Sequence, residues 1–296
     1  QNTWQDELVK KQGPLFKAKI QDIAIINSGS IVKTSRLELN DGRQFFAKTT
    51  DINHFEMLEF ESEGLIALNK FSNKSFINIP EVLGLYRLGD SSILLTPWLK
   101  FGYGSQKKLG QGLAKIHQAS TKNNPGQFGW SKNGFIGLGH QTKGWLDNWG
   151  KCFVELRLWP QLIKASNQGI NIATYTKTFE KLVHFLNEHK PQPSLVHGDL
   201  WSGNVGVNEK GEGVIFDPAS WWADREVDIA MTKLFGGFNN DFYDGYESTW
   251  PLPKNAKERI DIYNLYHIIN HANIFGGSHI NESIQKLENI RLKLNA

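Results

Sequence analysis

The sequence predicts an α+β fold of two lobes, in which a lobe with an antiparallel sheet and one helix precedes a larger, mainly helical lobe. Three observations lead to this prediction. The 296 residues are more than one hydrophobic core usually holds. Strand-like stretches gather in the first third of the chain, whereas helical periodicity dominates the rest. We therefore expect a first lobe over residues 1–97 and a second lobe over residues 98–296.

Strand-like segments in the first lobe surround one helical segment. Asn40–Gly42 favours a hairpin turn, because Asp-Gly tolerates a positive φ. From His54 to Lys70 the apolar residues recur at helical spacing, which predicts a helix. The predicted strands are Ile20–Ile26, Ile31–Leu39, Gln44–Thr49, Val82–Leu88 and Ser92–Trp98.

Helical periodicity prevails after Trp98. A hairpin is expected where the short strands Val205–Val207 and Val214–Phe216 flank a turn at residues 209–211. The expected helices are Ser105–Ser120, Trp145–Leu158, Thr174–His189 and a final set from Val227 to Leu294, broken at Pro251, Pro253 and Gly276-Gly277.

Charge and cysteine content narrow the possible partners. The 33 basic and 30 acidic residues give a net charge of +3 without a long run of like charges, so no nucleic-acid partner is expected. The single cysteine, Cys152, cannot form an internal disulfide, and no apolar stretch is long enough for a membrane span. We expect a cytoplasmic protein without a membrane partner, and a monomer by default.

The most informative stretch runs from His197 to Asn204 and is followed by Asp217. Phosphoryl transfer needs a carboxylate that accepts the hydroxyl proton and oxygen ligands that hold Mg²⁺ on the phosphates. An Asp with an Asn five residues later lets one loop present a base and a metal ligand, and the short hairpin brings back a second carboxylate. We therefore predict Asp199 as the catalytic base and Asn204 and Asp217 as ligands of Mg²⁺.

The first lobe offers matching residues for ATP. Gly29 and Ser30 lie between two predicted strands, where small residues let backbone N–H groups approach phosphates. Lys48 lies on the following strand and is expected to contact the α- and β-phosphates. These residues predict an ATP site in the first lobe.

Lys48 is expected to pair with a glutamate of the helix that follows it. Glu61 lies four residues before Leu65 and therefore shares the inward face of the helix, whereas Glu59 and Glu63 point aside. Where the chain crosses to the second lobe, three residues are expected to border the adenine: Pro97, Trp98 and Leu99.

Together these motifs resemble those of the fructosamine (ketosamine) kinase family, a branch of the aminoglycoside-phosphotransferase-like group within the protein-kinase-like fold. The resemblance implies ATP-dependent phosphorylation of a ketosamine, a sugar adduct of an amine, at its O3 hydroxyl. Ser28 departs from the pattern, because many members have a further glycine there. The resemblance extends over nearly the whole chain and is clearest in Leu195–Asn204, Phe216–Ser220, Asp224–Met231, Leu234–Phe238 and Leu265–His271.

Several residues near the predicted base are candidates for substrate contacts. A sugar's C–H face stacks on aromatic rings, and a cationic amine is attracted to the face of Trp. Trp201 is the strongest candidate, while Trp221 and Trp222 can equally pack in the core. Asp224 can accept hydrogen bonds from the sugar or the amine, and Asp228 is expected to hold the catalytic loop.

The predicted mechanism is direct in-line transfer without a phosphoenzyme. Two alternatives remain open. One is a small-molecule kinase of the same fold that acts on an aminoglycoside, choline or another alcohol, against which Trp201 and Leu234–Phe238 argue. The other is a non-catalytic nucleotide-binding module, against which the complete set of catalytic residues argues. Which ketosamine is used, and whether it is free or protein-bound, is left open by the sequence.

Overall fold

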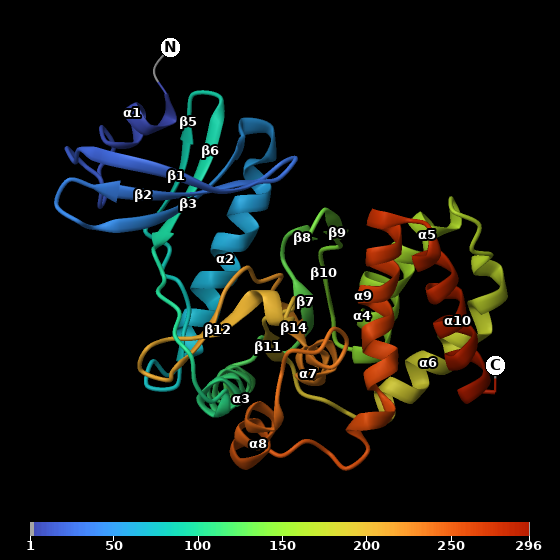
Figure 1. The fold of residues 1–296 in the computed structure, drawn as a ribbon. Helices are drawn as coiled ribbons and strands as arrows, with labels where there is room; N and C mark the ends of the chain where they lie inside the picture. The colour runs from blue at the N-terminus through green and yellow to red at the C-terminus, as the bar shows by residue number, and fades with distance from the viewer. Residues whose placement is uncertain (1–2, 296) are drawn as a thin grey trace.

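The computed structural model describes residues 3–295 and consists of two lobes (Figure 1). The first lobe holds a five-stranded sheet in which every neighbouring pair is antiparallel. Helix α1 (Trp4–Leu8) precedes this sheet, and helix α2 (Phe55–Phe71) follows its third strand. The two-lobed α+β fold predicted above is confirmed. In spatial order the strands are β1 (Ile20–Ser28), β2 (Lys33–Leu39), β3 (Gln44–Asp51), β6 (Ser91–Pro97) and β5 (Gly84–Leu88).

Alternation along β3 explains why Lys48 faces the space between the lobes. Phe45 and Ala47 are buried in the core of the first lobe, whereas Phe46 and Lys48 lie on the opposite face of the strand and line a pocket. The β2–β3 hairpin turns at Gly42, whose φ of +88° is a conformation that favours glycine. The hairpin turn predicted from the sequence is therefore confirmed.

α2 connects the two lobes and carries Glu61 (Figure 1). Leu65 and Leu68 are buried, and Glu61 lies on the same side because residues four and seven apart share a helix face. At Gly64 the helix approaches the second lobe so closely that a Cβ atom would lie 3.2 Å from Pro218 Cγ. A larger residue at this position would push α2 away from the second lobe.

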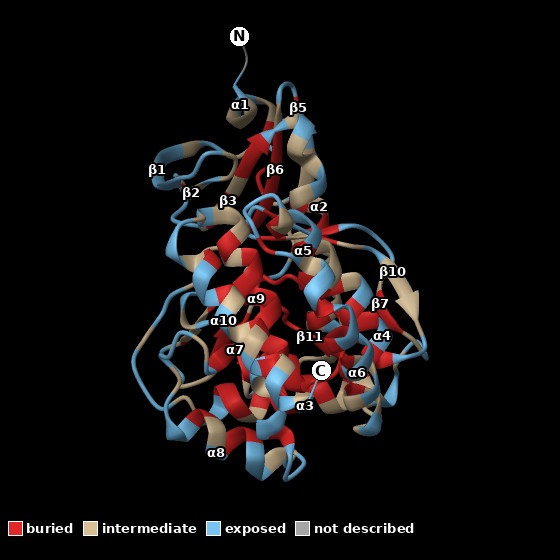
Figure 2. Ribbon diagram, turned by 90° about the vertical axis from the view of Figure 1, so that its right-hand side faces the viewer, coloured by how far each residue is buried: buried red, intermediate tan, exposed pale blue. Residues whose placement is uncertain are grey.

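The second lobe is built mainly from helices around a buried core, and Figure 2 shows extensive burial along α7 and α9. α3 packs against α8, and α9 packs against α5, α7 and α10. The chain breaks expected near Pro251 and Gly276 are confirmed. No helix among residues 3–295 is long and apolar enough to cross a bilayer. The helices are α3 (Lys107–Lys122), α4 (Trp149–Phe153), α5 (Trp159–Ser166), α6 (Thr176–Glu188), α7 (Glu226–Thr232), α8 (Asn240–Thr249), α9 (Ile260–Phe275) and α10 (Ser278–Lys293).

The second lobe contains more strands than the sequence predicts. A four-stranded antiparallel sheet has the order β10-β7-β14-β11, and β8 pairs with β9. The expected hairpin, β12–β13, is present and is extended by β4, which belongs to the first 97 residues but pairs with β13 in parallel. The bounds are β4 (Ile77–Asn78), β7 (Phe128–Trp130), β8 (Gly134–Ile136), β9 (Gly139–Gln141), β10 (Gly144–Leu146), β11 (Ser194–Val196), β12 (Val205–Val207), β13 (Gly213–Ile215) and β14 (Trp221–Ala223).

The helix expected over Trp145–Leu158 begins later and continues further. Trp145 belongs to β10, and α4 begins at Trp149, where the side chain of Asn148 caps the first turn. A π-helical turn, η2 (Val154–Leu158), then leads directly into α5. The expected start was wrong because strand pairing between β10 and β7 overrides the local helical periodicity.

A buried ion network holds the loop after α6 against the start of α7. His189 Nε2 lies 3.1 Å from Asp224 Oδ2 and 2.8 Å from Glu226 Oε2. Arg259 donates two hydrogen bonds to Glu226, and the Tyr263 hydroxyl donates to Asp224 at 2.6 Å. Burial alone would lower the pKa of His189, but the two carboxylates outweigh it and raise the pKa to about 9. When His189 is protonated, two cations balance two carboxylates.

We expect stability to depend on pH through His189. Because its pKa is about 9 in the folded state and about 6.5 in the unfolded chain, the stabilisation is complete below pH 6.5 and is lost as pH rises through 9. Consider the difference in free energy of unfolding between the unaltered protein and a His189→Gln variant. This difference should be larger at pH 6 than at pH 10 by roughly 3 kcal/mol. Urea unfolding at both pH values measures this.

The matched control for this experiment is His184→Gln, an exposed histidine on α6. Its effect on the free energy of unfolding should be small and similar at both pH values, because it lies outside the network. A His189→Gln effect that is equal at pH 6 and pH 10 would show that His189 gains no proton affinity on folding.

Candidate active site

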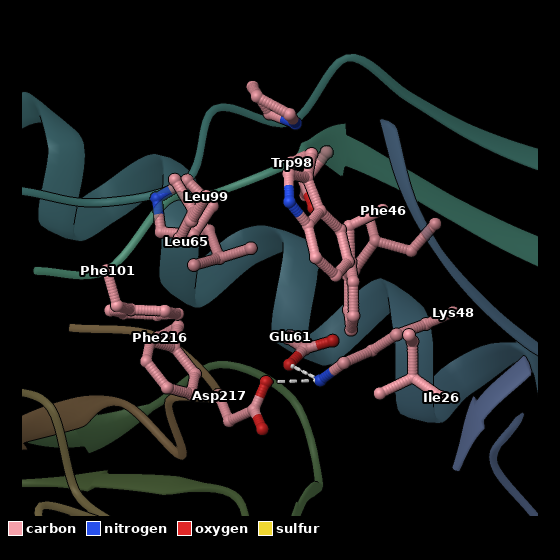
Figure 3. A pocket seen from close by; sticks show the side chains of 14 residues that line it. Ile26, Phe46, Lys48, Glu61, Leu65, Trp98, Leu99, Phe101, Phe216 and Asp217 are labelled. Atoms are coloured by element: carbon pink, nitrogen blue, oxygen red, sulfur yellow. Dashed lines mark hydrogen bonds and ion pairs between the residues drawn. The ribbon is translucent and has the colours of Figure 1, made fainter. Parts of the chain in front are cut away.

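Two adjoining hollows open between the lobes and share Lys48, Glu61 and Asp217. The first has a volume of about 290 Å³ and is drawn in Figure 3. The second has a volume of about 340 Å³ and also includes Asp199 and Asn204. The structure therefore brings the predicted base, the predicted metal ligands and the predicted phosphate-binding lysine together in one cleft.

Aromatic side chains form much of the wall of the first hollow (Figure 3). Phe46, two residues before Lys48 on β3, has its ring centroid 6.2 Å from that of Trp98. Phe101 and Phe216 lie in a second group, with ring centroids 5.7 Å apart. A pocket with flat apolar walls and a cation at its inner end suits an aromatic base that carries phosphates.

Lys48 lies between two carboxylates at the junction of the hollows (Figure 3). Its Nζ is 2.5 Å from Glu61 Oε1 and also forms an ion pair with Asp217. The Glu61 side chain is 12% exposed and that of Asp217 is 43% exposed. Glu61 is therefore placed to anchor the lysine, while Asp217 has a face open to a ligand.

The charges at this junction shift one another's pKa values. Burial alone would lower the pKa of Lys48, but the negative charges of Glu61 and Asp217 outweigh it and raise the pKa. Burial raises the pKa of Glu61, with a contribution from Asp217. Burial also opposes ionisation of Asp217, yet contact with Lys48 lowers the pKa of this carboxyl. At neutral pH the junction holds a charged lysine beside a charged Asp217.

The outer face of α2 is tied to the second lobe by Lys132, which lies between β7 and β8. Its Nζ is 3.2 Å from Glu59 Oε1 and 2.5 Å from Glu63 Oε1. These two glutamates therefore point away from Lys48, as predicted from the helix period. Exposed ion pairs of this kind stabilise weakly, but two on one helix face favour a single helix orientation.

The loop that carries Asp199 is held by hydrogen bonds from buried groups. Asp228 accepts from the backbone N–H groups of His197 and Gly198 at 2.8 and 2.9 Å. His197 Nε2 donates to Phe216 O at 2.6 Å, and its Nδ1 accepts from Asp199 N–H. Burial lowers the pKa of His197, which keeps the ring neutral in this tautomer. Asp228 and His197 thus fix the positions of both acidic loops.

Two residues of these loops have a positive φ. Gly198 has a φ of +88°, and a Cβ atom there would lie only 2.0 Å from Ala219 O, so only glycine fits. Asp217 has a φ of +51°, which is uncommon for a residue with a side chain and is followed by Pro218. Such backbone strain persists where neighbouring contacts impose it, and it is frequent at functional sites.

Asp199 and Asn204 are in direct contact. Asn204 Nδ2 donates to the Asp199 backbone oxygen at 2.9 Å and to its carboxylate at 3.2 Å. Burial and the negative charge of Asp217 raise the pKa of Asp199 to about 7, although the bond from Asn204 opposes this shift. A carboxyl with a pKa near neutrality can accept a proton more readily than an exposed aspartate.

The donor atoms beside Asp199 suit a hard divalent cation. Since Asn204 makes its contacts through Nδ2, its amide oxygen is the atom that it can offer to a metal. Asp217 adds a partly exposed carboxylate. Carboxylate and amide oxygens are the ligands that Mg²⁺ prefers, with water in the remaining positions. The residues therefore fit the predicted metal.

Trp201 lines the second hollow and not the first. It lines this hollow together with Asp199, Phe135 and Gly137, and its side chain is half exposed. Phe135 belongs to β8, so the strands missed in the sequence supply part of the wall. An aromatic surface next to a carboxylate suits a sugar that carries an amine.

Some of the residues predicted for nucleotide binding line a hollow, and others do not. Pro97, Trp98 and Leu99 line the first hollow. Gly29 and Ser30 lie in the turn between β1 and β2, but they do not line either hollow, whereas their neighbours Asn27 and Val32 line the second. Gly29 N–H donates to Val32 O at 3.1 Å, which closes the turn.

Two predicted substrate contacts are wrong in this structure. Trp221 is only 2% exposed, and its ring stacks on Trp149 with centroids 5.6 Å apart. Asp224 is buried in the ion network with His189 and Tyr263 and lines neither hollow. Trp221 belongs to β14, an inner strand of the four-stranded sheet that pairs with β11, and Asp224 directly follows this strand.

Several residues that line the cleft were not predicted from the sequence, among them four aromatic ones. Phe46 could have been found from its spacing of two from Lys48, which places both side chains on one strand face. Phe216 directly precedes Asp217, but being next to Asp217 in the sequence does not show where the Phe216 side chain points. Phe101 and Phe135 lie in segments without local periodicity, and their roles follow only from tertiary packing.

Phosphoryl transfer from ATP needs little covalent chemistry from a protein, but it needs cations and carboxylates fixed around the phosphates. The cleft supplies these groups between a sheet-rich lobe and a helical lobe, which defines an ATP-dependent phosphotransferase of the protein-kinase-like fold. The solved structure of spectinomycin phosphotransferase, in complex with ADP and spectinomycin, has this fold: it is 15% identical with a TM-score of 0.55, covering 96% of this chain and 92% of that chain.

Proteins that are more similar in sequence and structure show the family of this chain. The model of the fructosamine kinase family matches residues 3–293. A probable ketoamine kinase of Synechocystis is 39% identical over 254 residues, which cover 84% of each protein. The solved "Putative fructosamine-3-kinase" of Haemophilus somnus is 26% identical with a TM-score of 0.81, over 92% of each chain. The chain belongs to the fructosamine kinase family.

Proposed function

We propose that this protein transfers the γ-phosphoryl group of ATP, with Mg²⁺, to the O3 hydroxyl of ketosamines, the fructosamine or ribulosamine adducts of amines. One observation carries the proposal: Asp199 and the half-exposed Trp201 line the same hollow as Lys48 and Asp217. This arrangement supports a hydroxyl-bearing, amine-bearing acceptor held beside the phosphate-binding residues.

Each residue of the cleft has a separate role in the proposed reaction. Lys48, anchored by Glu61, binds the α- and β-phosphates, and the aromatic pocket holds the adenine. Asp199 orients the acceptor hydroxyl and takes its proton. Transfer is direct, so no phosphorylated enzyme forms. Asn204 and Asp217 would hold Mg²⁺, which would supply positive charge to neutralise the phosphates.

A second candidate is phosphorylation of another small alcohol, such as an aminoglycoside or choline. The fold supports this reaction equally well, because relatives with the same fold include a spectinomycin phosphotransferase. The open aromatic surface at Trp201 favours a sugar adduct, since an aromatic face binds both a sugar's C–H surface and a cationic amine. The choice between these acceptors is a matter for substrate assays.

Release of ADP, measured with ribuloselysine, fructoselysine, kanamycin and choline as acceptors, tests the proposal. We expect turnover with a ketosamine and a rate at least tenfold lower with kanamycin and choline, because a site that binds particular polar groups discriminates strongly against acceptors that lack them. Phosphorus and carbon NMR of the product should place the phosphate on O3.

The outcomes of this assay separate the alternatives. Turnover with kanamycin or choline alone would keep the kinase reaction and overturn the proposed acceptor. Binding of ATP without turnover of any acceptor would favour a nucleotide-binding module. Removal of divalent cations with EDTA should abolish turnover, and activity that persists in EDTA would contradict the roles of Asn204 and Asp217.

A further inference from the structure

A continuous series of rings leads from the second hollow to the protein surface. The ring centroid of Trp201 is 6.4 Å from that of Phe235, and Phe235 is 6.2 Å from His271. His271 then lies 4.5 Å from both Phe275 and His279. We name these five residues the aromatic track. The track begins at a residue that lines the hollow of Asp199 and ends at the start of α10.

The aromatic track is assembled from parts of the chain that are distant in sequence. Trp201 comes from the catalytic loop, Phe235 from the segment between α7 and α8, His271 and Phe275 from the end of α9, and His279 from α10. Trp201, Phe235 and Phe275 are 40%, 52% and 65% exposed.

The exposed rings of the track form an apolar surface on which a ligand can bind. Single exposed apolar residues are ordinary, but several in mutual contact that continue out of a hollow are typical of a binding surface. The β8–β9 turn lies near the same end of α9: Gly137, which lines the hollow with Trp201, is close to Ile274, and the next residue, Leu138, is exposed. The track is therefore an open apolar lane rather than a closed pocket.

The chemistry of a ketosamine indicates what this lane would hold. Asp199, where the acceptor hydroxyl of the sugar would bind, and Trp201 line the same hollow, so the amine and its substituent can leave the hollow past Trp201. Trp201 can stack on the cationic amine, and the carbon chain beyond it then meets Phe235 and Phe275. Burial and the neighbouring His279 lower the pKa of His271, so this ring is uncharged at neutral pH and suits a hydrocarbon chain.

We propose that the aromatic track binds the alkyl chain of the amine component of the acceptor, and that it makes the enzyme prefer ketosamines of long-chain amines over those of short ones. This inference rests on the proposed function. It assigns Phe235 and Phe275 a role in acceptor specificity, through apolar contact that increases with the length of the chain.

The test compares two acceptors that carry the same sugar, one on methylamine and one on hexylamine. Part of the extra chain is buried on the open track, so we expect kcat/KM to be about tenfold higher for the hexylamine adduct. In a Phe235→Ala/Phe275→Ala double variant this ratio should fall to about two, because the contact surface is removed. Phe275→Leu, which keeps apolar area, should retain most of the preference.

Phe16→Ala is the matched control, since it removes an exposed ring of the first lobe, and it should keep the tenfold ratio. Equal rates with both adducts in the unaltered enzyme, or a ratio that the double variant does not change, would overturn the role of the track while leaving the proposed function intact. If the unaltered enzyme phosphorylates neither adduct, the proposed function fails and this inference fails with it.

Discussion

Replacement of Asp199 by Asn should lower kcat for ketosamine phosphorylation about 10³-fold. Asparagine keeps the size of the side chain but cannot accept the hydroxyl proton. The carboxylate is suited to this task because burial and Asp217 raise its pKa to about 7. The loop should keep its shape, since Asp228 and His197 hold it through backbone groups. ATP affinity should therefore change little, and steady-state kinetics with a separate ATP-binding measurement check both expectations.

A suitable control is Asp244→Asn, which makes the same change at an exposed position on α8. It should leave kcat within about twofold, as surface substitutions usually do. The role of Asp199 would be contradicted by an Asp199→Asn variant that retains more than a tenth of the activity. Parallel loss of ATP binding would instead indicate that the loop has changed its structure.

Replacement of Lys48 by Met should reduce kcat/KM for ATP by about 10²–10³-fold, the usual effect of removing one fixed charge-stabilising group. It should also lower the free energy of unfolding by roughly 3 kcal/mol, because Glu61 is left buried beside Asp217 without a cation. Methionine has nearly the same length as the lysine stem, so the packing around Phe46 is preserved. Coupled ADP assays and urea unfolding measure the two effects.

Lys74→Met is the comparison for this variant, because Lys74 is exposed and outside the cleft. A double variant, Lys48→Met/Glu61→Gln, provides a second check. Neutralising Glu61 removes the unpaired charge, so the double variant should recover stability without recovering activity. Recovery of both would mean that Lys48 has only a structural role.

Local signals in the sequence were sufficient for the five-stranded sheet and α2 of the first lobe, and for the hairpin that joins the loops of Asp199 and Asp217. The Asn40–Gly42 turn and the alternation along β3 depend on neighbouring residues, and both are present in the structure. The choice of Glu61 over Glu59 and Glu63 rested on helix periodicity, and Glu61 is the one beside Lys48. Patterns of this kind depend only on residues close together in the chain, so they can be recognised in a single sequence.

Other parts of the structure depend on contacts between distant segments. Strands β7 to β10 have three residues each, too few for a recognisable alternation, and they are stabilised by pairing with one another and with β14. Trp221 was misplaced for this reason: as a tryptophan near the motif it fits a sugar contact, but its strand turns it toward Trp149. The walls formed by Phe101 and Phe135 likewise result from tertiary packing.

β4 lies in the first 97 residues but forms a ladder with β13, which ends two residues before Asp217. Contact at Gly64 and the ion pairs of Lys132 join α2 to the second lobe from two further directions. Folding of the chain therefore brings Glu61 to Lys48, so the ion pair that holds the lysine at the cleft is a product of the fold itself.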